Sequence, residues 1–267
     1  MPTLQTCVIC QQSNELVNSH VVPNFIRRHS LRKNAKIKFQ SVLDKRRTVT
    51  QDIYKGKLCC RGCEQALSSP ETHASKILLE LFDNRTDGVL RYGEKFHAFC
   101  VGIALKGAAL ELYNQANEHT LCKMPEGQKT SLKRLIKACR KQLLGRTTSR
   151  EYVRVWMFSF VDFRNEINTN MAVIEILGTF PAWHKSKFIG MLVVFKGFIL
   201  LVTNKSTTFS CAKRAIKTSA GQVDFKLNAR APICLVPAVS GFLMKTLEAQ
   251  MLALLLGTKS SGDIKAP

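Results

Sequence analysis

Two stretches in the middle of the chain repeat apolar residues at helical spacing, over residues 96–114 and 131–144. Each predicts a helix with an apolar face. In the second stretch, the opposite face carries Lys133, Arg134, Lys137, Arg140 and Lys141. Gly145 follows the second stretch and predicts its end. Gly102 and Gly107 weaken the first helix, so we expect another element to pack closely against it at these positions.

Two further helix starts are expected earlier in the chain. The first start is expected at Glu64, where Glu64-Gln65-Ala66-Leu67 would form the first turn of a helix. A second start is predicted at Ser69-Pro70, with Ser69 as the cap and Pro70 in the first turn, because proline is best tolerated there. Apolar residues then follow at helical spacing (Ile77, Leu78 and Leu81).

After residue 150 the sequence no longer repeats apolar residues at helical spacing and becomes typical of β-strands. β-branched and aromatic residues over 152–158 and 171–177 predict two strands. The longest apolar run, residues 188–203, is interrupted by Lys196-Gly197, so it predicts a hairpin and no transmembrane segment. Residues 240–256 predict an apolar terminal helix.

These elements predict an α+β protein in three parts. The expected parts are a metal-bearing module with helices over 1–90, a helical segment over 91–148, and a C-terminal antiparallel sheet with a terminal helix over 149–267. The polar segment Arg146-Thr147-Thr148-Ser149 is the best candidate for a domain joint.

The net charge narrows the class of partner. The 267 residues carry a formal charge of +21, which predicts an anionic partner such as nucleic acid, an acidic membrane surface or another polyanion. A general basic bias of the source proteome is the alternative explanation. Of these partners we expect nucleic acid, DNA rather than RNA, and no membrane. A protein partner could bind the C-terminal region.

Cysteine spacing points to a metal site. Cys7-x-x-Cys10 and Cys60-x-x-Cys63 supply the four thiolates that a closed structural Zn²⁺ site needs, about fifty residues apart. Cys59 has no partner at that spacing and is expected to be a bystander. The chain opens without a basic start and apolar run, so we expect a reducing, cytoplasmic setting. In that setting such pairs bind zinc more often than they act in redox catalysis. The remaining cysteines are expected to be small buried apolar residues (Cys100, Cys122, Cys139, Cys211 and Cys234).

Positive charge is concentrated between the two cysteine pairs. Residues 27–61 contain twelve basic and two acidic residues, which accounts for ten of the +21 charges. Such a segment predicts phosphate contacts that give affinity without sequence preference. A disordered basic loop is the alternative. The candidate phosphate-binding residues are Arg27, Arg28, Arg32, Lys33, Lys45, Arg46, Arg47, Lys55 and Arg61.

One histidine lies next to the first cysteine pair. It belongs to the string Ser19-His20-Val21-Val22-Pro23, which is followed by Gln51-Asp52-Ile53-Tyr54-Lys55 and by Leu58-Cys59-Cys60-x-x-Cys63-Glu64 with Ser68 and Glu71. Together with the first pair, these motifs resemble the HNH endonucleases. The resemblance is closer to a bacterial branch of treble-clef zinc proteins that carry Ser-His-Ile-Ile-Pro and Leu-Cys-x-x-Cys-Glu. It covers residues 5–75.

The resemblance implies a treble-clef zinc site and phosphodiester hydrolysis. His20 would take the place of the general base that activates water, with catalytic Mg²⁺ or Mn²⁺ held by Glu64 and Asp52. The chain departs from the usual pattern, since Ser19 replaces an acid, Glu64 replaces a histidine and no asparagine occupies the middle position. Glu64 could instead only cap the following helix. The alternative function is a noncatalytic zinc protein that binds nucleic acid.

Overall fold

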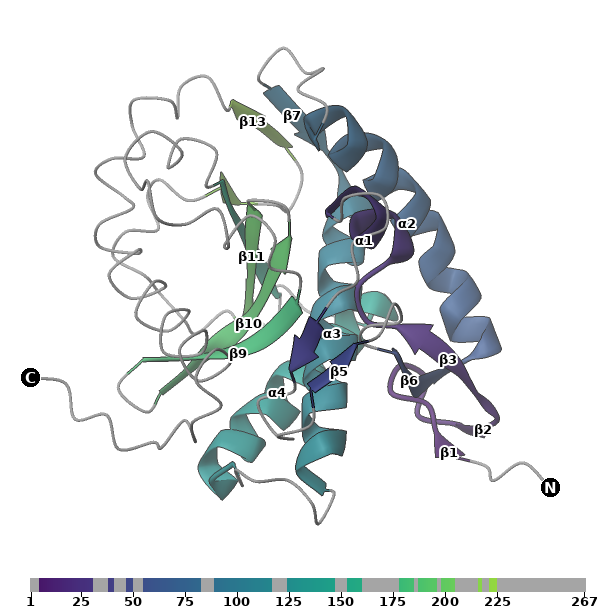
Figure 1. The fold of residues 1–267 in the computed structure, drawn as a ribbon. Helices are drawn as coiled ribbons and strands as arrows, with labels where there is room; N and C mark the ends of the chain where they lie inside the picture. The colour runs from purple at the N-terminus through teal and green to yellow at the C-terminus, as the bar shows by residue number, and fades with distance from the viewer. Residues whose placement is uncertain are drawn as a thin grey trace, which may run out of the picture.

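The elements are arranged around one long helix, α3 (Figure 1). The structure, a computed structural model, describes residues 5–30, 38–40, 47–49, 55–82, 89–116, 124–146, 153–159, 178–184, 187–195, 198–204, 216–217 and 221–224. In chain order the elements are β1 (Gln5–Thr6), β2 (Ser13–Asn14), β3 (Leu16–His20), α1 (Asn24–Ser30), β4 (Lys38–Gln40), β5 (Arg47–Val49), β6 (Lys55–Cys60), α2 (Arg61–Phe82), β7 (Val89–Tyr92), α3 (Glu94–Ala116), α4 (Glu126–Leu143), β8 (Arg154–Ser159), β9 (Gly178–His184), β10 (Lys187–Phe195), β11 (Phe198–Thr203), β12 (Ile216–Lys217) and β13 (Gly221–Asp224).

The two helices expected from periodicity are confirmed as α3 and α4. α4 ends near Gly145, which has a φ of 65°, the left-handed conformation that glycine adopts most readily. The two glycines of α3 lie at close contacts, as expected. A Cβ at Gly102 would stand 3.3 Å from Leu67 of α2, and one at Gly107 would stand 2.6 Å from Oγ1 of Thr179 in β9.

The expected second helix start at Ser69-Pro70 is wrong. α2 runs without a break over Arg61–Phe82, with Pro70 inside it. The residues Leu67, Ala74 and Leu78 are buried on one stripe that crosses the proline. Packing of this stripe against α3 holds the helical register, so the tertiary contacts outweigh the backbone hydrogen bond that Pro70 cannot donate.

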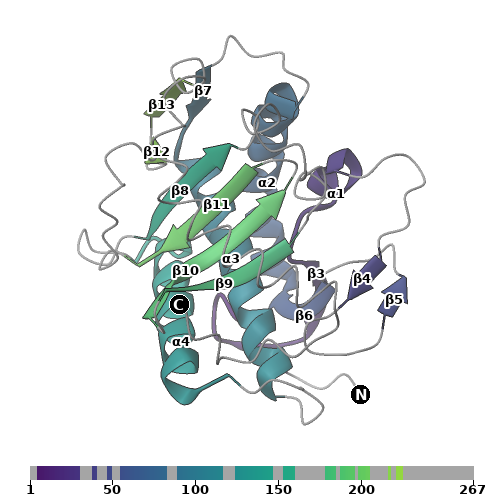
Figure 2. The same ribbon diagram turned by 60° about the vertical axis from the view of Figure 1, so that its left-hand side comes forward.

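Five antiparallel strands form the main sheet, in the order β12-β8-β11-β10-β9 (Figure 2). The predicted hairpin is confirmed, with Phe195 paired to Phe198 across the turn. The predicted strand over 152–158 is confirmed as β8. The strand and terminal helix expected over 171–177 and 240–256 lie outside the described residues.

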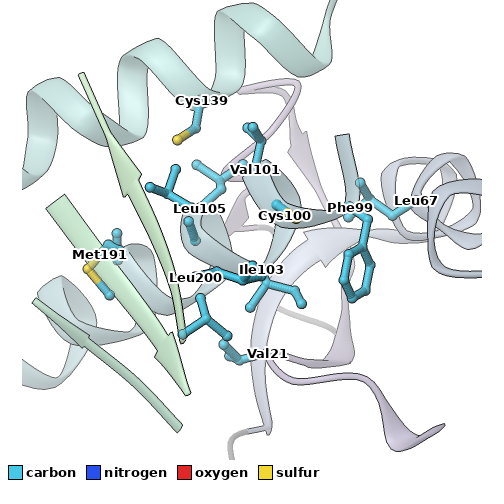
Figure 3. Close-up of a cluster of buried hydrophobic side chains, with 14 of the residues drawn as sticks. Val21, Leu67, Phe99, Cys100, Val101, Ile103, Leu105, Cys139, Met191 and Leu200 are labelled. Atoms are coloured by element: carbon cyan, nitrogen blue, oxygen red, sulfur yellow. The ribbon is translucent and has the colours of Figure 1, made fainter. Parts of the chain in front are cut away.

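α3 lies between the sheet and α2, with α4 packed beside it (Figures 1 and 2). Figure 3 shows the resulting core, in which Met191 and Leu200 of the sheet face α3, and Cys139 of α4 and Leu67 of α2 approach from other sides. Within the described residues, α3 is the one helix whose length and composition would allow it to cross a membrane, and most of that stretch is buried inside the protein.

The described residues of all three predicted parts contribute to a single hydrophobic cluster. It extends from Cys7 and Ile9 near the N-terminus, through α3, to Val202 in β11. The described elements combine helices with antiparallel sheets, as the predicted α+β class requires. The division of the chain at residues 90 and 148 stays a prediction.

Candidate metal centre and the charged cluster beside it

A tight hairpin presents the first cysteine pair. β1 pairs with β2, and the turn between them carries Cys7 and Cys10. Gln11 adopts a φ of 63°, an uncommon conformation for a residue with a side chain. Its side-chain amide and its backbone N–H both donate to the Cys7 carbonyl, each at 3.0 Å, which holds the turn in place.

The second pair lies where strand β6 passes directly into helix α2. Cys60 is the last residue of β6 and Cys63 lies in the first turn of α2. The backbone N–H of Val8 donates to the Leu58 carbonyl at 3.0 Å. This hydrogen bond joins the two segments that carry the cysteine pairs. Cys59, the neighbour of Cys60, is fully buried in the core and does not belong to the cysteine cluster, as expected.

The four expected ligands converge. The sulfur atoms of Cys7, Cys10, Cys60 and Cys63 all lie within 4.8 Å of one another, and those of Cys10 and Cys60 are 3.9 Å apart. A tetrahedral ion with bonds of about 2.3 Å to sulfur places its ligands about 3.8 Å apart. The cluster therefore has the size of a closed metal–thiolate site. All cysteines in the described part of the chain are free thiols.

Crowding of four thiols affects their ionisation. Burial raises the pKa of Cys63, as do the neighbouring thiols, and burial also raises the pKa of Cys10. Burial raises the pKa of Cys7 as well, but backbone N–H groups of Cys60, Cys10 and Ile9 outweigh this effect and lower it to about 7. The thiolate form of Cys7 is thus favoured in the protein alone, whereas a bound cation would favour the thiolate form of its ligands.

His20 lies on the outer side of a two-stranded ribbon formed by β3 and β6. It pairs with Lys55, and Asn18 pairs with Lys57, so these four side chains share one face. Lys55 and Lys57 are exposed, and His20 is partly buried, with its Nε2 atom enclosed. The intervening residue Ser19 is fully buried on the opposite face, which packs against α3.

A buried lysine lies directly beneath this ribbon. Lys106 of α3 has a side chain that is only 2% exposed. Its Nζ donates to Oε1 of Glu64 at 3.1 Å, to Oε1 of Glu71 at 3.4 Å, and to the backbone carbonyl of His20 at 3.2 Å. We call Lys106, Glu64, Glu71 and the His20 carbonyl the Lys106 cluster. It ties the end of β3 to the first turns of α2 and to the middle of α3.

Glu64 uses both carboxylate oxygens within the protein. Oε1 contacts Lys106, and Oε2 accepts a hydrogen bond from the Ser19 hydroxyl at 2.9 Å. Burial raises the pKa of Glu71, Lys106 lowers it, and Glu64 raises it, with a net rise. The structure therefore brings the carboxylate of Glu64 close to the backbone carbonyl of His20, while the His20 side chain lies on the other face of the ribbon from Ser19, which contacts Glu64. The lysine between them was not predicted from the sequence.

The predicted phosphate-binding residues are only partly described. Arg61 is exposed next to Cys60, Lys55 is exposed at the opposite end of β6 from Cys60, and Arg28 is exposed on α1. Arg27 lies in α1 and Arg47 in β5. Asp52, Arg32, Lys33, Lys45 and Arg46 lie outside the described residues, so the third predicted catalytic group and most of the basic segment stay predictions.

A signal for Lys106 was present in the sequence. It is the only lysine, arginine or acidic residue between Phe96 and Leu110, in the middle of an apolar helix. Glu64 and Glu71 are seven residues apart and share the stripe of α2 that buries Leu67. A charge on each of two facing apolar stripes predicts a buried ion pair, because a buried charge is stable only with a partner.

The site thus combines a four-sulfur cluster, a buried ion cluster and an exposed basic strand. The sulfur cluster can hold a metal ion, the Lys106 cluster fixes the strand end at His20, and the lysines can contact an anion. Comparison of the chain with protein-family models, with curated proteins and with solved structures gave no match.

Proposed function

We propose that this chain is a zinc-stabilised nucleic-acid-binding protein. The four cysteines would hold one structural Zn²⁺ in a treble-clef module, because four thiolates and closed tetrahedral geometry suit that ion. The module would present a basic face to the phosphate backbone. We call Lys55, Lys57 and Arg61 the basic ribbon face.

The placement of the two β6 lysines carries this proposal. Both are exposed on the side of the ribbon that faces away from α3, whereas Leu58 on the other side is buried in the core. Arg61 follows at the start of α2, next to the cysteine cluster. Fixed cations on a rigid metal-bound element bind phosphates with little ordering cost, and the net charge of +21 adds long-range attraction.

A matched pair of charge reversals tests the proposal. Lys57→Glu alters the basic ribbon face, and Lys76→Glu alters an exposed lysine about 22 Å farther along α2 than Arg61. We expect Lys57→Glu to weaken binding to a DNA duplex and to reduce the slope of log affinity against log salt by about one. We expect a smaller effect from Lys76→Glu. Fluorescence anisotropy over a salt series measures both, and an RNA duplex of the same sequence tests the preference for DNA.

Zinc content serves as the folding control for both variants. Equal weakening by Lys57→Glu and Lys76→Glu would show that binding depends on total charge and not on the basic ribbon face. If the zinc-loaded protein bound neither DNA nor RNA at low salt, the proposal would be wrong.

Phosphodiester hydrolysis is the second candidate function. The position of His20 favours it, since the residue lies at the end of β3, opposite the exposed Lys55. A histidine held there could act as a general base toward a phosphate bound by the lysine. Both oxygens of Glu64 are engaged and Nε2 of His20 is enclosed, so hydrolysis would require these groups to rearrange. For that reason we place binding first.

His20→Gln tests hydrolysis without removing the bulk of the side chain. If His20 is the general base, plasmid cleavage in Mg²⁺ or Mn²⁺ should fall by roughly 10²–10⁴-fold, the usual contribution of such a group. DNA affinity and zinc content should stay at the level of the parent. Cleavage by the variant at the parent rate would contradict the role given to His20.

A further inference from the structure

The Lys106 cluster has the form of a coordination site. Three oxygen atoms, two from α2 and one from the end of β3, surround one cation, at 3.1, 3.2 and 3.4 Å from Nζ. Two of them are carboxylate oxygens and the third is a main-chain carbonyl oxygen. These are the ligand types that hard divalent cations take in proteins. An ammonium group has three donors, and here the three N–H groups match three acceptors.

Charge and solvent access also fit a cation site. Two carboxylates face one ammonium group, so the cluster has more negative than positive charge. Lys106 is 2% exposed, but Glu64 and Glu71 are 29% and 31% exposed. Water therefore reaches part of both glutamate side chains. A small cation placed at Nζ could keep water molecules as its remaining ligands, as Mg²⁺ usually does.

The cluster connects parts that a bound ion would also connect. The Ser19 hydroxyl donates to Oε2 of Glu64 and holds it in place. Glu64 directly follows Cys63, one of the four clustered cysteines. Gly102 lies one turn before Lys106 on α3 and contacts Leu67, which lies between the two glutamates on α2. This close approach of the helices brings Nζ within reach of both carboxylates.

We propose that Lys106 is an internal cation, and that its ammonium group fills an oxygen-lined site which binds a divalent cation once the lysine is removed. In the native protein Glu64 then serves as a counter-ion that positions the end of β3 and is not a ligand for Mg²⁺ or Mn²⁺. The inference does not depend on nucleic-acid binding, because it concerns contacts inside the fold.

Lys106→Ala provides the test, with Mn²⁺ as the probe and electron paramagnetic resonance as the measurement. Truncation removes the ammonium group and leaves room for an ion and its water. We expect the zinc-loaded variant to bind a single Mn²⁺ ion saturably, and the parent not to do so. A further Glu71→Gln change in the variant should weaken Mn²⁺ binding by at least about tenfold.

Lys106→Met is the matched control, because it removes the charge but fills the space with an apolar chain of similar length. If Lys106 had only a structural role, both variants would be less stable than the parent, and neither would bind Mn²⁺. The proposal is overturned if the zinc-loaded Lys106→Ala protein shows no saturable Mn²⁺ binding. It is also overturned if Lys106→Met binds Mn²⁺ equally well, or if the parent binds it through Glu71.

A refolding experiment covers the case in which Lys106→Ala does not fold alone. Removing one partner of a buried ion pair leaves charges uncompensated and is strongly destabilising. If the inference is correct, Mn²⁺ during refolding should restore zinc-loaded protein, and Lys106→Met/Glu64→Gln/Glu71→Gln should fold without it. The proposal is overturned if Lys106→Ala stays unfolded in Mn²⁺ while the triple variant folds.

Discussion

Among single residues, His97 shows how a polar side chain is accommodated in the core. The residue is 3% exposed, and its Nε2 lies 3.1 Å from the Val153 carbonyl oxygen. Its Nδ1 lies 3.1 Å from the side-chain nitrogen of Gln142, whose oxygen accepts from the backbone N–H of Val153 at 2.8 Å. These contacts suit a neutral ring that donates from Nε2 and accepts at Nδ1. The three residues thereby connect α3, α4 and the start of β8.

This arrangement predicts that the protein becomes less stable to unfolding as the pH falls. Burial lowers the pKa of His97, although the hydrogen bond with Val153 opposes this effect. A lowered pKa in the folded state means that the unfolded chain binds the extra proton first. Stability is therefore full above the unfolded pKa of about 6.5 and declines as the pH falls toward the lower folded value.

The loss should be about 1.4 kcal/mol for each unit by which the two pKa values differ. Urea unfolding between pH 8 and pH 5 measures it against a His97→Gln variant, which cannot titrate there. If the parent and the variant lose stability in parallel over this range, the histidine is not the titrating group.

For the helices and strands, the contact between α3 and β9 leaves little space between the two elements. Gly107 faces Thr179, which is buried, at a distance that leaves no room for a Cβ. Gly127 in α4 has open space around its Cβ position, so it offers a control in another helix. The helix preference for alanine over glycine is similar at both sites, which leaves packing as the difference.

Gly107→Ala should destabilise the protein by about 1–3 kcal/mol, the usual cost of overpacking, despite the gain in helix propensity. Gly127→Ala should be neutral or stabilising by up to about 1 kcal/mol. Thermal unfolding of the two variants measures the contrast. Equal stability of the variants would mean that α3 and β9 do not pack as closely as the contact at Gly107 requires.

The same elements show what local sequence could predict. Periodicity located α3, α4 and the β10–β11 hairpin because each contains a regular repeat of apolar residues. Pro70 suggested a helix start that does not exist, because the local sequence does not show how α2 packs against α3. The sequence does not predict β9 because Pro181 interrupts its pattern, yet proline is tolerated there since β9 is the edge strand of this sheet among the described residues.

The candidate site was predictable only where residue spacing carried the information. The Cys-x-x-Cys spacing identified all four cysteines of the sulfur cluster, since each pair is local in the sequence. The partners of Glu64 come from segments up to 45 residues away, and their contacts depend on how three elements pack. Ser19 and Glu71 were noted as parts of motifs but without a structural role, and Lys106 was not noted. Assignment of such a cluster requires the tertiary structure.

At the level of the whole molecule, the single core makes the N-terminal and C-terminal parts interdependent. The buried faces of α3 are covered by α2 on one side and by β8–β11 on the other. The last residue of α3 is Ala116 and the last of β11 is Thr203, so 87 residues must be added before strands β8–β11 have all been made (203 − 116 = 87). At about 5–20 residues per second, translation takes roughly 4–17 s to supply them.

The order of synthesis therefore leaves an apolar helix uncovered on the ribosome. During those seconds the stretch Glu94–Tyr113, which is long and apolar enough to enter a lipid bilayer, has no sheet to protect it. Until its last strands emerge, the apolar face of α3 that the sheet will cover is exposed, and exposed apolar surface favours aggregation.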